Sequence, residues 1–164
     1  MNRRDPIPTT PEPGAAAVTQ LVLRVFRLNG VLLHRGDQLV APLGLTSARW
    51  QMLGAIALAG TPLTAPQIAE AMGVTRQGAQ KQLNMLLEQG LVEARPNPAH
   101  RRSPLYVLTP QGLALYRQAD ALWAAQAVEL AALIPSAQAH AATGTLETML
   151  HELHTPNLSS KVES

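Results

Sequence analysis

Apolar residues near the start of the chain recur with the spacing of a long helix. From Ala15 to about Val40 they fall three or four residues apart, the periodicity of an α-helical seam, at Val18, Leu21, Val25, Leu28, Leu32 and Leu39. A second set makes the helix apolar on more than one side: Val22, Phe26, Leu33 and Val40. We therefore expect burial against two surfaces. The pattern does not distinguish a central core helix from a helix at a subunit interface.

Glycine, proline and threonine then mark the ends of shorter helices. Thr46 can cap a helix that Gly60 closes. Thr64 and Thr75 can cap two more helices, and Gly73 between them fits a left-handed turn. The sequence therefore predicts a helix, a tight turn and another helix before Gly90.

Two short β-prone runs follow, at Leu91 to Ala94 and Leu105 to Leu108, and the stretch between them is rich in Pro, Asn and Ser. A hairpin with a projecting loop is the simplest interpretation. Thr109 and Pro110 then begin a long helix that ends near Pro135, and a last helix precedes a polar tail.

The predicted fold is mostly α with a small β-hairpin (α+β), a winged helix-turn-helix flanked by long helices. We place one domain at 15–154, with the winged helix at 62–109 and the long helices at 15–41 and 110–154. Disordered tails are expected at 1–14 and 155–164.

The composition excludes several kinds of chemistry. The 164 residues contain no cysteine, which removes disulfides, thiolate metal ligands and cysteine nucleophiles and favours a cytoplasmic protein. The net charge of +2 is too small to indicate nucleic-acid binding by itself. Arg24 and Arg27 interrupt the most apolar stretch, so we expect no transmembrane helix.

The helix that follows Thr75 carries residues suited to reading DNA. Its first two turns present four polar side chains, Arg76, Gln77, Gln80 and Lys81. In the major groove arginine pairs with guanine and glutamine pairs with adenine. A solvated helix face would carry similar residues, so this helix alone leaves both interpretations open.

The loop between the β-prone runs adds positive charge beside that helix. We expect Arg95, Arg101 and Arg102 at the hairpin tip, where they would reach the phosphate backbone or the minor groove. Asn97, Pro98, Ser103 and Pro104 would hold the loop's shape, and Asn97 is also a candidate DNA contact. Two positive features beside one helix-turn-helix predict nucleic-acid binding.

These residues resemble those of a known family. The stretch TAPQIAEAMGVTRQGAQKQLNMLLEQGLVEARPNPAHRRSPLYVLTPQG is similar to the winged-helix core of the multiple-antibiotic-resistance regulator (MarR) family, and the flanking helices extend the resemblance from about Val18 to Leu153. It implies a homodimer, built from the first helix and the last two, that binds a pseudo-palindromic operator in double-stranded DNA and usually represses transcription. It also implies that residues 75–81 read the major groove and that the wing arginines contact DNA.

One wing position departs from the family pattern. The family usually has an aspartate two residues before an arginine, and the two pair; here His100 stands ahead of Arg102. We hypothesise that His100 makes the wing more cationic and donates to phosphate, increasingly so as the solution becomes more acidic. A solvated histidine without a role is the alternative.

Many members of the family release DNA when a small aromatic or phenolic molecule binds between the dimerisation helices and the DNA-binding lobes. The candidates here are His34, Arg49, Trp50 and Trp123, because an anionic aromatic ligand needs a flat apolar surface and a donor. Ordinary packing is the alternative for each residue.

Other functions have less support. His140, His151, Glu152 and His154 lack the spacing of the zinc protease motif, so a solvated helix end is favoured and no metal or cofactor is expected. Glycine-rich phosphate loops, nucleophile elbows and paired catalytic carboxylates are missing, so we expect no enzyme. A protein-binding winged helix is the stronger rival to a DNA-binding one.

Overall fold

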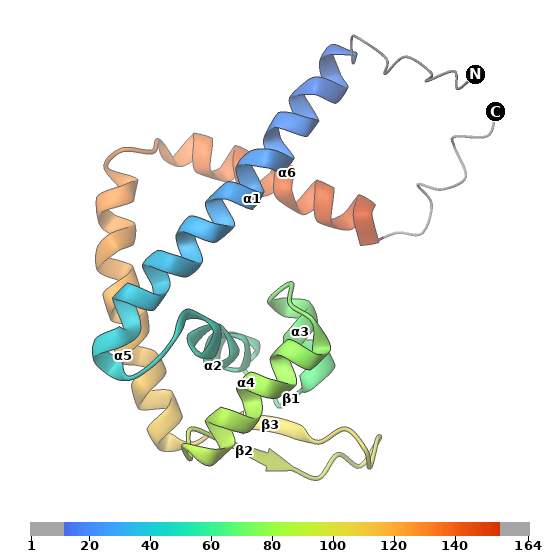
Figure 1. Cartoon of the computed structure of the whole chain (residues 1–164), viewed down its shortest axis with the longest axis vertical. Coiled ribbons are helices and arrows are strands. Elements are labelled where there is room, and N and C mark those ends of the chain that lie inside the picture. Colours follow the sequence, from blue (N-terminus) through green and yellow to red (C-terminus); the bar gives the residue numbers. More distant parts are fainter. Residues whose placement is uncertain (1–11, 155–164) are drawn as a thin grey trace, which may run out of the picture. The chain divides into compact units, whose positions relative to one another are not determined.

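The structure is a computed structural model that describes residues 12–154. Its elements follow the chain in the order α1 (Pro13–Val40), a 3₁₀ turn (Ala41–Leu43), α2 (Ser47–Ala59), β1 (Leu63–Thr64), α3 (Ala65–Ala71), α4 (Arg76–Glu88), β2 (Val92–Arg95), β3 (Leu105–Leu108), α5 (Pro110–Ala131) and α6 (Ser136–His154) (Figure 1). The predicted fold class, mostly helical with a small hairpin, is confirmed. The predicted tail at 155–164, and residues 1–11 of the predicted tail at 1–14, lie outside the described residues. Helix α1 begins at Pro13, so the first predicted tail extends too far.

The described chain forms two compact units, and the division between them falls in α5, after Asp120. The first unit contains α1 to the first half of α5, and the second contains the rest of α5 and α6. The single domain predicted at 15–154 stays a prediction.

The predicted threonine caps are present at the starts of the helices. The Thr46 hydroxyl accepts a hydrogen bond from the Arg49 backbone nitrogen at the start of α2. Thr64 forms a reciprocal capping box with Gln67 at the start of α3, which satisfies two backbone donors. Gly73 has a φ of 61°, the left-handed conformation predicted for the turn between α3 and α4.

The wing is part of a three-stranded antiparallel sheet in the order β1-β3-β2. Val92 lies opposite Leu108 and Arg95 opposite Leu105, so the predicted hairpin is confirmed with β2 starting one residue later than expected. The sequence did not predict β1, because its two residues are too few to show an alternating pattern.

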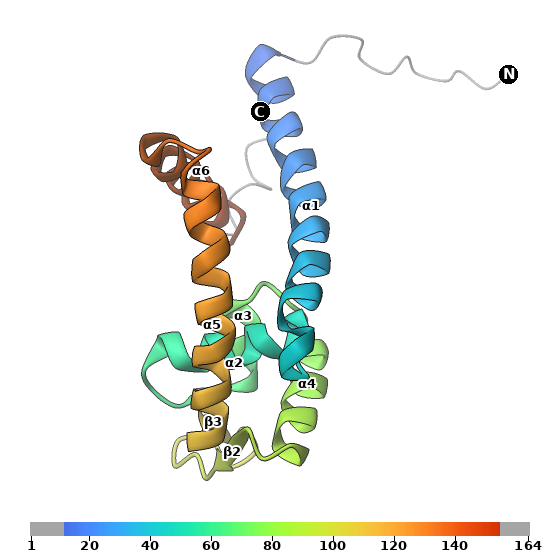
Figure 2. The ribbon, with the colours of Figure 1, turned by 90° about the vertical axis from the view of Figure 1, so that its left-hand side faces the viewer.

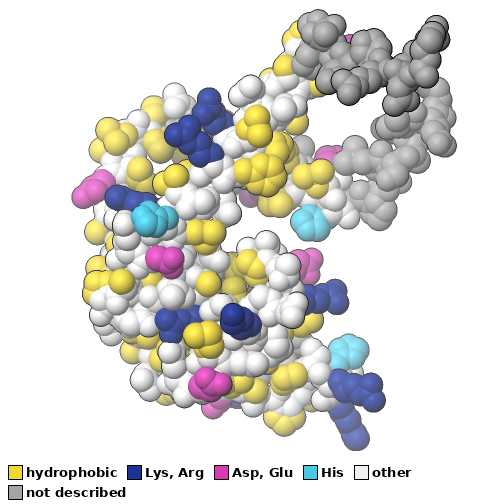
Figure 3. Space-filling view, in the orientation of Figure 1, with side chains coloured by type: hydrophobic (Ala, Val, Ile, Leu, Met, Phe, Trp, Pro, Cys, Tyr) yellow, Lys and Arg dark blue, Asp and Glu magenta, His cyan; other side chains and the backbone are white. Residues whose placement is uncertain are grey.

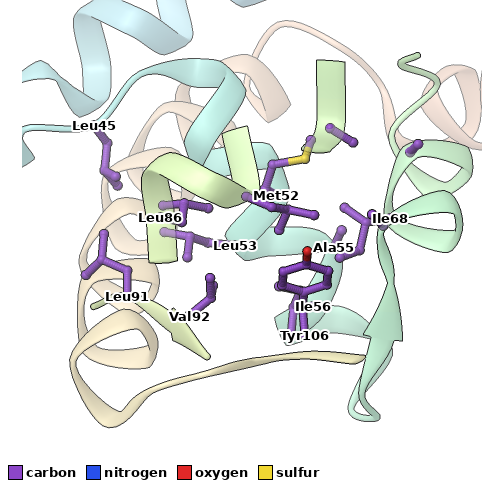
Figure 4. Packing of buried hydrophobic residues seen from close by; sticks show 14 of the residues in the cluster. Leu45, Met52, Leu53, Ala55, Ile56, Ile68, Leu86, Leu91, Val92 and Tyr106 are labelled. Carbon is purple, nitrogen blue, oxygen red and sulfur yellow. The ribbon is translucent and has the colours of Figure 1, made fainter. Parts of the chain in front are cut away.

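Side chains from α2, α3, α4 and the sheet form the core of the first unit (Figure 4). Met52 and Leu53 of α2, Ile68 of α3 and Leu86 of α4 are almost completely buried, and Tyr106 of β3 is 2% exposed. Burial of each large apolar side chain contributes roughly 1.5–3 kcal/mol. This core fixes α4 relative to the wing.

The beginning of α5 is attached directly to the residues that follow α4. The Thr109 hydroxyl donates to the Gly90 carbonyl oxygen over 2.8 Å, and the Thr109 backbone nitrogen donates to the Leu91 carbonyl oxygen over 3.1 Å. A Cβ atom on Gly112 would lie 1.8 Å from that Leu91 oxygen, so only glycine fits there. Figure 2 shows α5 beginning beside β3, at the end of the unit where β2 also lies.

Several large apolar side chains of α1 are exposed in the single chain. Phe26 is 70% exposed, and the only buried residues of this helix are Gly36 and Val40. Within the first unit, α1 is therefore not buried on two sides, and its burial at an interface with a second copy stays a prediction.

The segment Pro13–Leu43 is long and apolar enough, by length and composition, to cross a membrane, with a mean hydropathy of 1.4. Core helices of soluble proteins and signal sequences often have the same properties. Arg24 and Arg27 lie inside this segment, and charged residues are costly at the centre of a bilayer. The absence of a transmembrane helix stays a prediction.

Candidate nucleic-acid interface

Helix α4 has one buried side and one exposed side. Ala79, Leu83 and Leu86 are buried in the core. The outward side forms a shallow concave surface lined by Thr75, Gln77, Gly78, Gln80, Lys81, Asn84, Met85 and Glu88. Arg76, the first residue of α4, is exposed as well.

The residues of α4 that were predicted to read DNA bases are not equally available for contact with DNA. Gln77 and Lys81 are exposed. The Thr75 hydroxyl already accepts from the Gly78 backbone nitrogen over 3.0 Å, so it serves as a cap. Gln80 is half-buried, and its amide nitrogen donates to Asn84 Oδ1 over 2.8 Å and to the Tyr106 hydroxyl over 2.9 Å.

Asn84 also lies on this surface, and it was not among the DNA-reading residues predicted from the sequence. It is exposed and follows Gln77 by seven residues and Lys81 by three, which places the three side chains on one helix face. This spacing could have identified Asn84 once the core-facing leucines were assigned.

Hydrogen bonds inside the wing loop hold its shape. The Asn97 side-chain nitrogen donates to the Ser103 carbonyl oxygen over 2.9 Å, and Asn97 Oδ1 accepts from the Ala99 backbone nitrogen over 3.0 Å. The Ser103 backbone nitrogen donates to the His100 carbonyl oxygen over 2.9 Å. Asn97 therefore has the loop-holding role that was predicted, and its use as a DNA contact stays a prediction.

The cationic residues of the wing occupy two different places. His100, Arg101 and Arg102 are exposed in the loop, and Figure 3 shows basic and histidine side chains projecting from the wing tip. Arg95 lies in β2 instead of at the tip, so its predicted position was wrong. Its guanidinium forms an ion pair with Glu93, with Nε donating to Glu93 Oε1 over 2.8 Å, so part of its charge is neutralised.

The four candidate effector residues have different surroundings. His34 of α1 is exposed, and its Nε2 lies 3.1 Å from the side-chain nitrogen of Gln38. Arg49 is 9% exposed in the first turn of α2, and its Nε donates to the Thr46 hydroxyl over 3.4 Å. Trp50 packs against the core of the first unit, whereas Trp123 is half-buried in the second.

The histidines near the chain end, His140, His151 and His154, are exposed residues of α6. Among residues 12–154, no group of three or more His, Cys, Asp or Glu side chains is placed to hold a metal ion. His154 Nδ1 instead lies 2.7 Å from the Leu150 carbonyl oxygen of its own helix.

Two helices joined by a tight turn and followed by a β-hairpin define a winged-helix protein. A family model described as the MarR family matches residues 43–103. The multiple antibiotic resistance protein MarR of Salmonella typhimurium is 32% identical over 101 residues, which cover 59% of this chain and 69% of that protein. This chain belongs to the MarR family.

Two further relatives are similar to this chain. An uncharacterized protein of Mycobacterium tuberculosis is 47% identical over 95 residues, and this match covers 58% of the chain and 65% of that relative's length. The structure of a MarR mutant from E. coli complexed with operator DNA has a TM-score of 0.60 and 25% identity, and covers 82% of this chain and 96% of that chain.

Proposed function

We propose that this protein is a cytoplasmic transcriptional regulator that binds double-stranded DNA in a sequence-specific way. The observation that carries the proposal is the pairing of an exposed, polar α4 face with a cationic wing tip in one winged helix. Arg76, Gln77 and Lys81 are exposed on α4, and Arg101 and Arg102 are exposed on the wing. A recognition helix reads base edges while adjacent cations bind phosphates.

The comparison with the E. coli MarR mutant supports this assignment. That protein was crystallised with operator DNA, and it is similar to this chain over 82% of the chain's length. In this chain the core residues Leu83 and Leu86 hold α4 with its polar face outward. Residues 76–81 would therefore enter the major groove and residues 100–102 would contact the backbone or the adjacent minor groove.

In this proposal the protein binds DNA as a homodimer, and α1 contributes to the interface between the two copies. The exposed apolar residues of α1 include Val18, Leu23, Phe26, Leu28, Val31 and Leu32. Surfaces of this kind are typical of interfaces between proteins. Two-fold symmetry would set two α4 helices into successive major grooves, which matches a pseudo-palindromic operator.

In this proposal the protein represses transcription, and a small aromatic or phenolic ligand relieves the repression. Arg49 and Trp50 are adjacent in α2 and supply a cation and a flat apolar ring; His34 and Trp123 are the further candidates. A ligand would release DNA by favouring a spacing of the two α4 helices that does not match the operator.

Selection from a random pool of DNA duplexes tests the function. We expect an enriched site with two-fold symmetry and half-site centres roughly one helical turn, about 10 base pairs, apart. The mass of the complex in solution should correspond to two protomers on one duplex. Failure to enrich any sequence would overturn the proposal and favour a winged helix that binds another protein.

A further inference from the structure

A chain of hydrogen bonds links the wing to the outward face of α4. The Tyr106 hydroxyl of β3 accepts from the Gln80 amide nitrogen over 2.9 Å, and the same nitrogen donates to Asn84 Oδ1 over 2.8 Å. Tyr106 is 2% exposed, Gln80 is half-buried and Asn84 is exposed. These hydrogen bonds therefore connect a core residue, Tyr106, to a surface residue, Asn84.

Gln80 is poorly suited to read a base in this arrangement. A glutamine that recognises adenine donates one amide hydrogen to N7 and accepts from the N6 amino group. Both amide hydrogens of Gln80 already have partners, Asn84 and Tyr106. Pairing with adenine would therefore break at least one of these bonds, and losing the bond to the buried Tyr106 hydroxyl would cost free energy.

Asn84 is in the opposite situation. Its Oδ1 accepts from Gln80, which fixes the orientation of the amide and leaves a second lone pair on that oxygen. Within residues 12–154, the Asn84 side-chain nitrogen makes no hydrogen bond, so both of its hydrogens are available. Asn84 can present one donor and one acceptor side by side, which is the pattern that adenine requires in the major groove.

Asn84 also occupies the right face of the helix. It lines the same shallow concave surface as Gln77 and Lys81. Residues spaced by three and four positions lie on one side of a helix. When Gln77 and Lys81 enter the major groove, Asn84 faces the same groove, about one helical turn beyond Lys81.

We propose that Asn84 is a base-reading residue with a preference for adenine, and that Gln80 and Tyr106 are positioning residues that orient it. This inference rests on the proposed DNA-binding function. It transfers the reading role that the sequence suggested for Gln80 to a residue one helical turn later.

The test compares the base preferences of the parent and its variants, measured at every position of the site that the parent selects. At one position in each half-site, the parent should prefer A·T by roughly tenfold or more. Asn84→Ala should remove that preference. Asn84→Asp should shift it towards C·G, because a carboxylate can only accept a hydrogen bond and the cytosine amino group can donate one.

Tyr106→Phe tests the positioning role, because it removes the hydroxyl and keeps the ring that packs in the core. We expect a weaker preference at the Asn84 position and unchanged preferences elsewhere. In the Asn84→Ala background, Tyr106→Phe should have no further effect at that position, since coupled residues are not additive. A purely structural role for Tyr106 would lower affinity for all sequences alike.

Gln89→Glu is the matched control, because it makes the same change from amide to carboxylate just after α4, at its C-cap, and should leave the selected site unchanged. If the parent selects no site, the proposed function fails. If the parent selects a site and Asn84→Asp selects the same one, the inference alone fails. If only Tyr106→Phe has no effect on the motif, the positioning role is overturned.

Discussion

Arg95 and Glu93 lie two residues apart on β2 and form an ion pair, with Arg95 Nε donating to Glu93 Oε1 over 2.8 Å. Alternate residues of a strand point to the same side of the sheet, which brings these two side chains together. Both are about half exposed, at 58% and 49%, and such surface pairs contribute only about 0–1 kcal/mol to stability. The main effect of Glu93 is to reduce the positive charge at the base of the wing.

Removing the negative charge of Glu93 should therefore strengthen DNA binding. We expect Glu93→Gln to raise the affinity for the selected duplex roughly threefold or more at low salt, because Arg95 becomes free to neutralise a phosphate. Fluorescence anisotropy with a labelled duplex measures the effect. Glu129→Gln makes the same charge change on an exposed residue of α5 and should change affinity less. Equal affinities for Glu93→Gln and the parent would show that Arg95 does not act at the interface.

The wing and α4 should affect specificity differently. Arg102→Ala removes a phosphate contact in our account, so it should weaken binding to the selected duplex and to a scrambled duplex by the same factor. Arg76→Ala should mainly weaken binding to the selected duplex, because arginine pairs with guanine in the major groove. The ratio of the two affinities separates these effects. A large loss of specificity in Arg102→Ala would contradict the assignment of the wing.

His100 should make DNA binding dependent on pH. A protonated histidine beside a phosphate has a favourable charge, so the hypothesis predicts that the parent binds DNA more tightly in mildly acidic than in mildly alkaline solution. His100→Ala should lose most of this dependence. His154→Ala, at the exposed end of α6, should retain it. An unchanged pH dependence in His100→Ala would reject the hypothesis.

Two glycine substitutions should have opposite effects on stability. A Cβ atom at Gly112 would lie 1.8 Å from the backbone oxygen of Leu91, so Gly112→Ala should lower the free energy of unfolding by about 3 kcal/mol. Gly144 of α6 has open space around its Cβ position, so Gly144→Ala should stabilise the protein by up to about 1 kcal/mol. Urea unfolding at one protein concentration compares the two variants. A stable Gly112→Ala protein would mean that α5 is not held against Leu91.

Local signals in the sequence predicted much of the first unit. Thr46, Thr64 and Thr75 cap the helices where they were expected to, because an N-cap acts on the backbone of the next three residues. Asn97 holds the wing loop through partners within six residues. Such short-range interactions depend little on the rest of the fold.

Features that depend on distant partners were not predicted. The hydrogen bond from Gln80 to Tyr106 joins residues 26 positions apart, so no local pattern indicates that Gln80 is held away from the bases. The position of Arg95 depends on the register of β2 against β3, which residue types alone do not determine. The exposure of Phe26 could not be predicted either, because an interface helix and a core helix have the same apolar pattern.

The salt dependence of DNA affinity tests the central claim most directly, since it counts the phosphates that the α4 faces and wing tips neutralise. For a dimer that neutralises about ten phosphates, we predict a plot of log affinity against log salt concentration with a slope of roughly −9. A slope near zero for the duplex that the parent binds best would contradict this account.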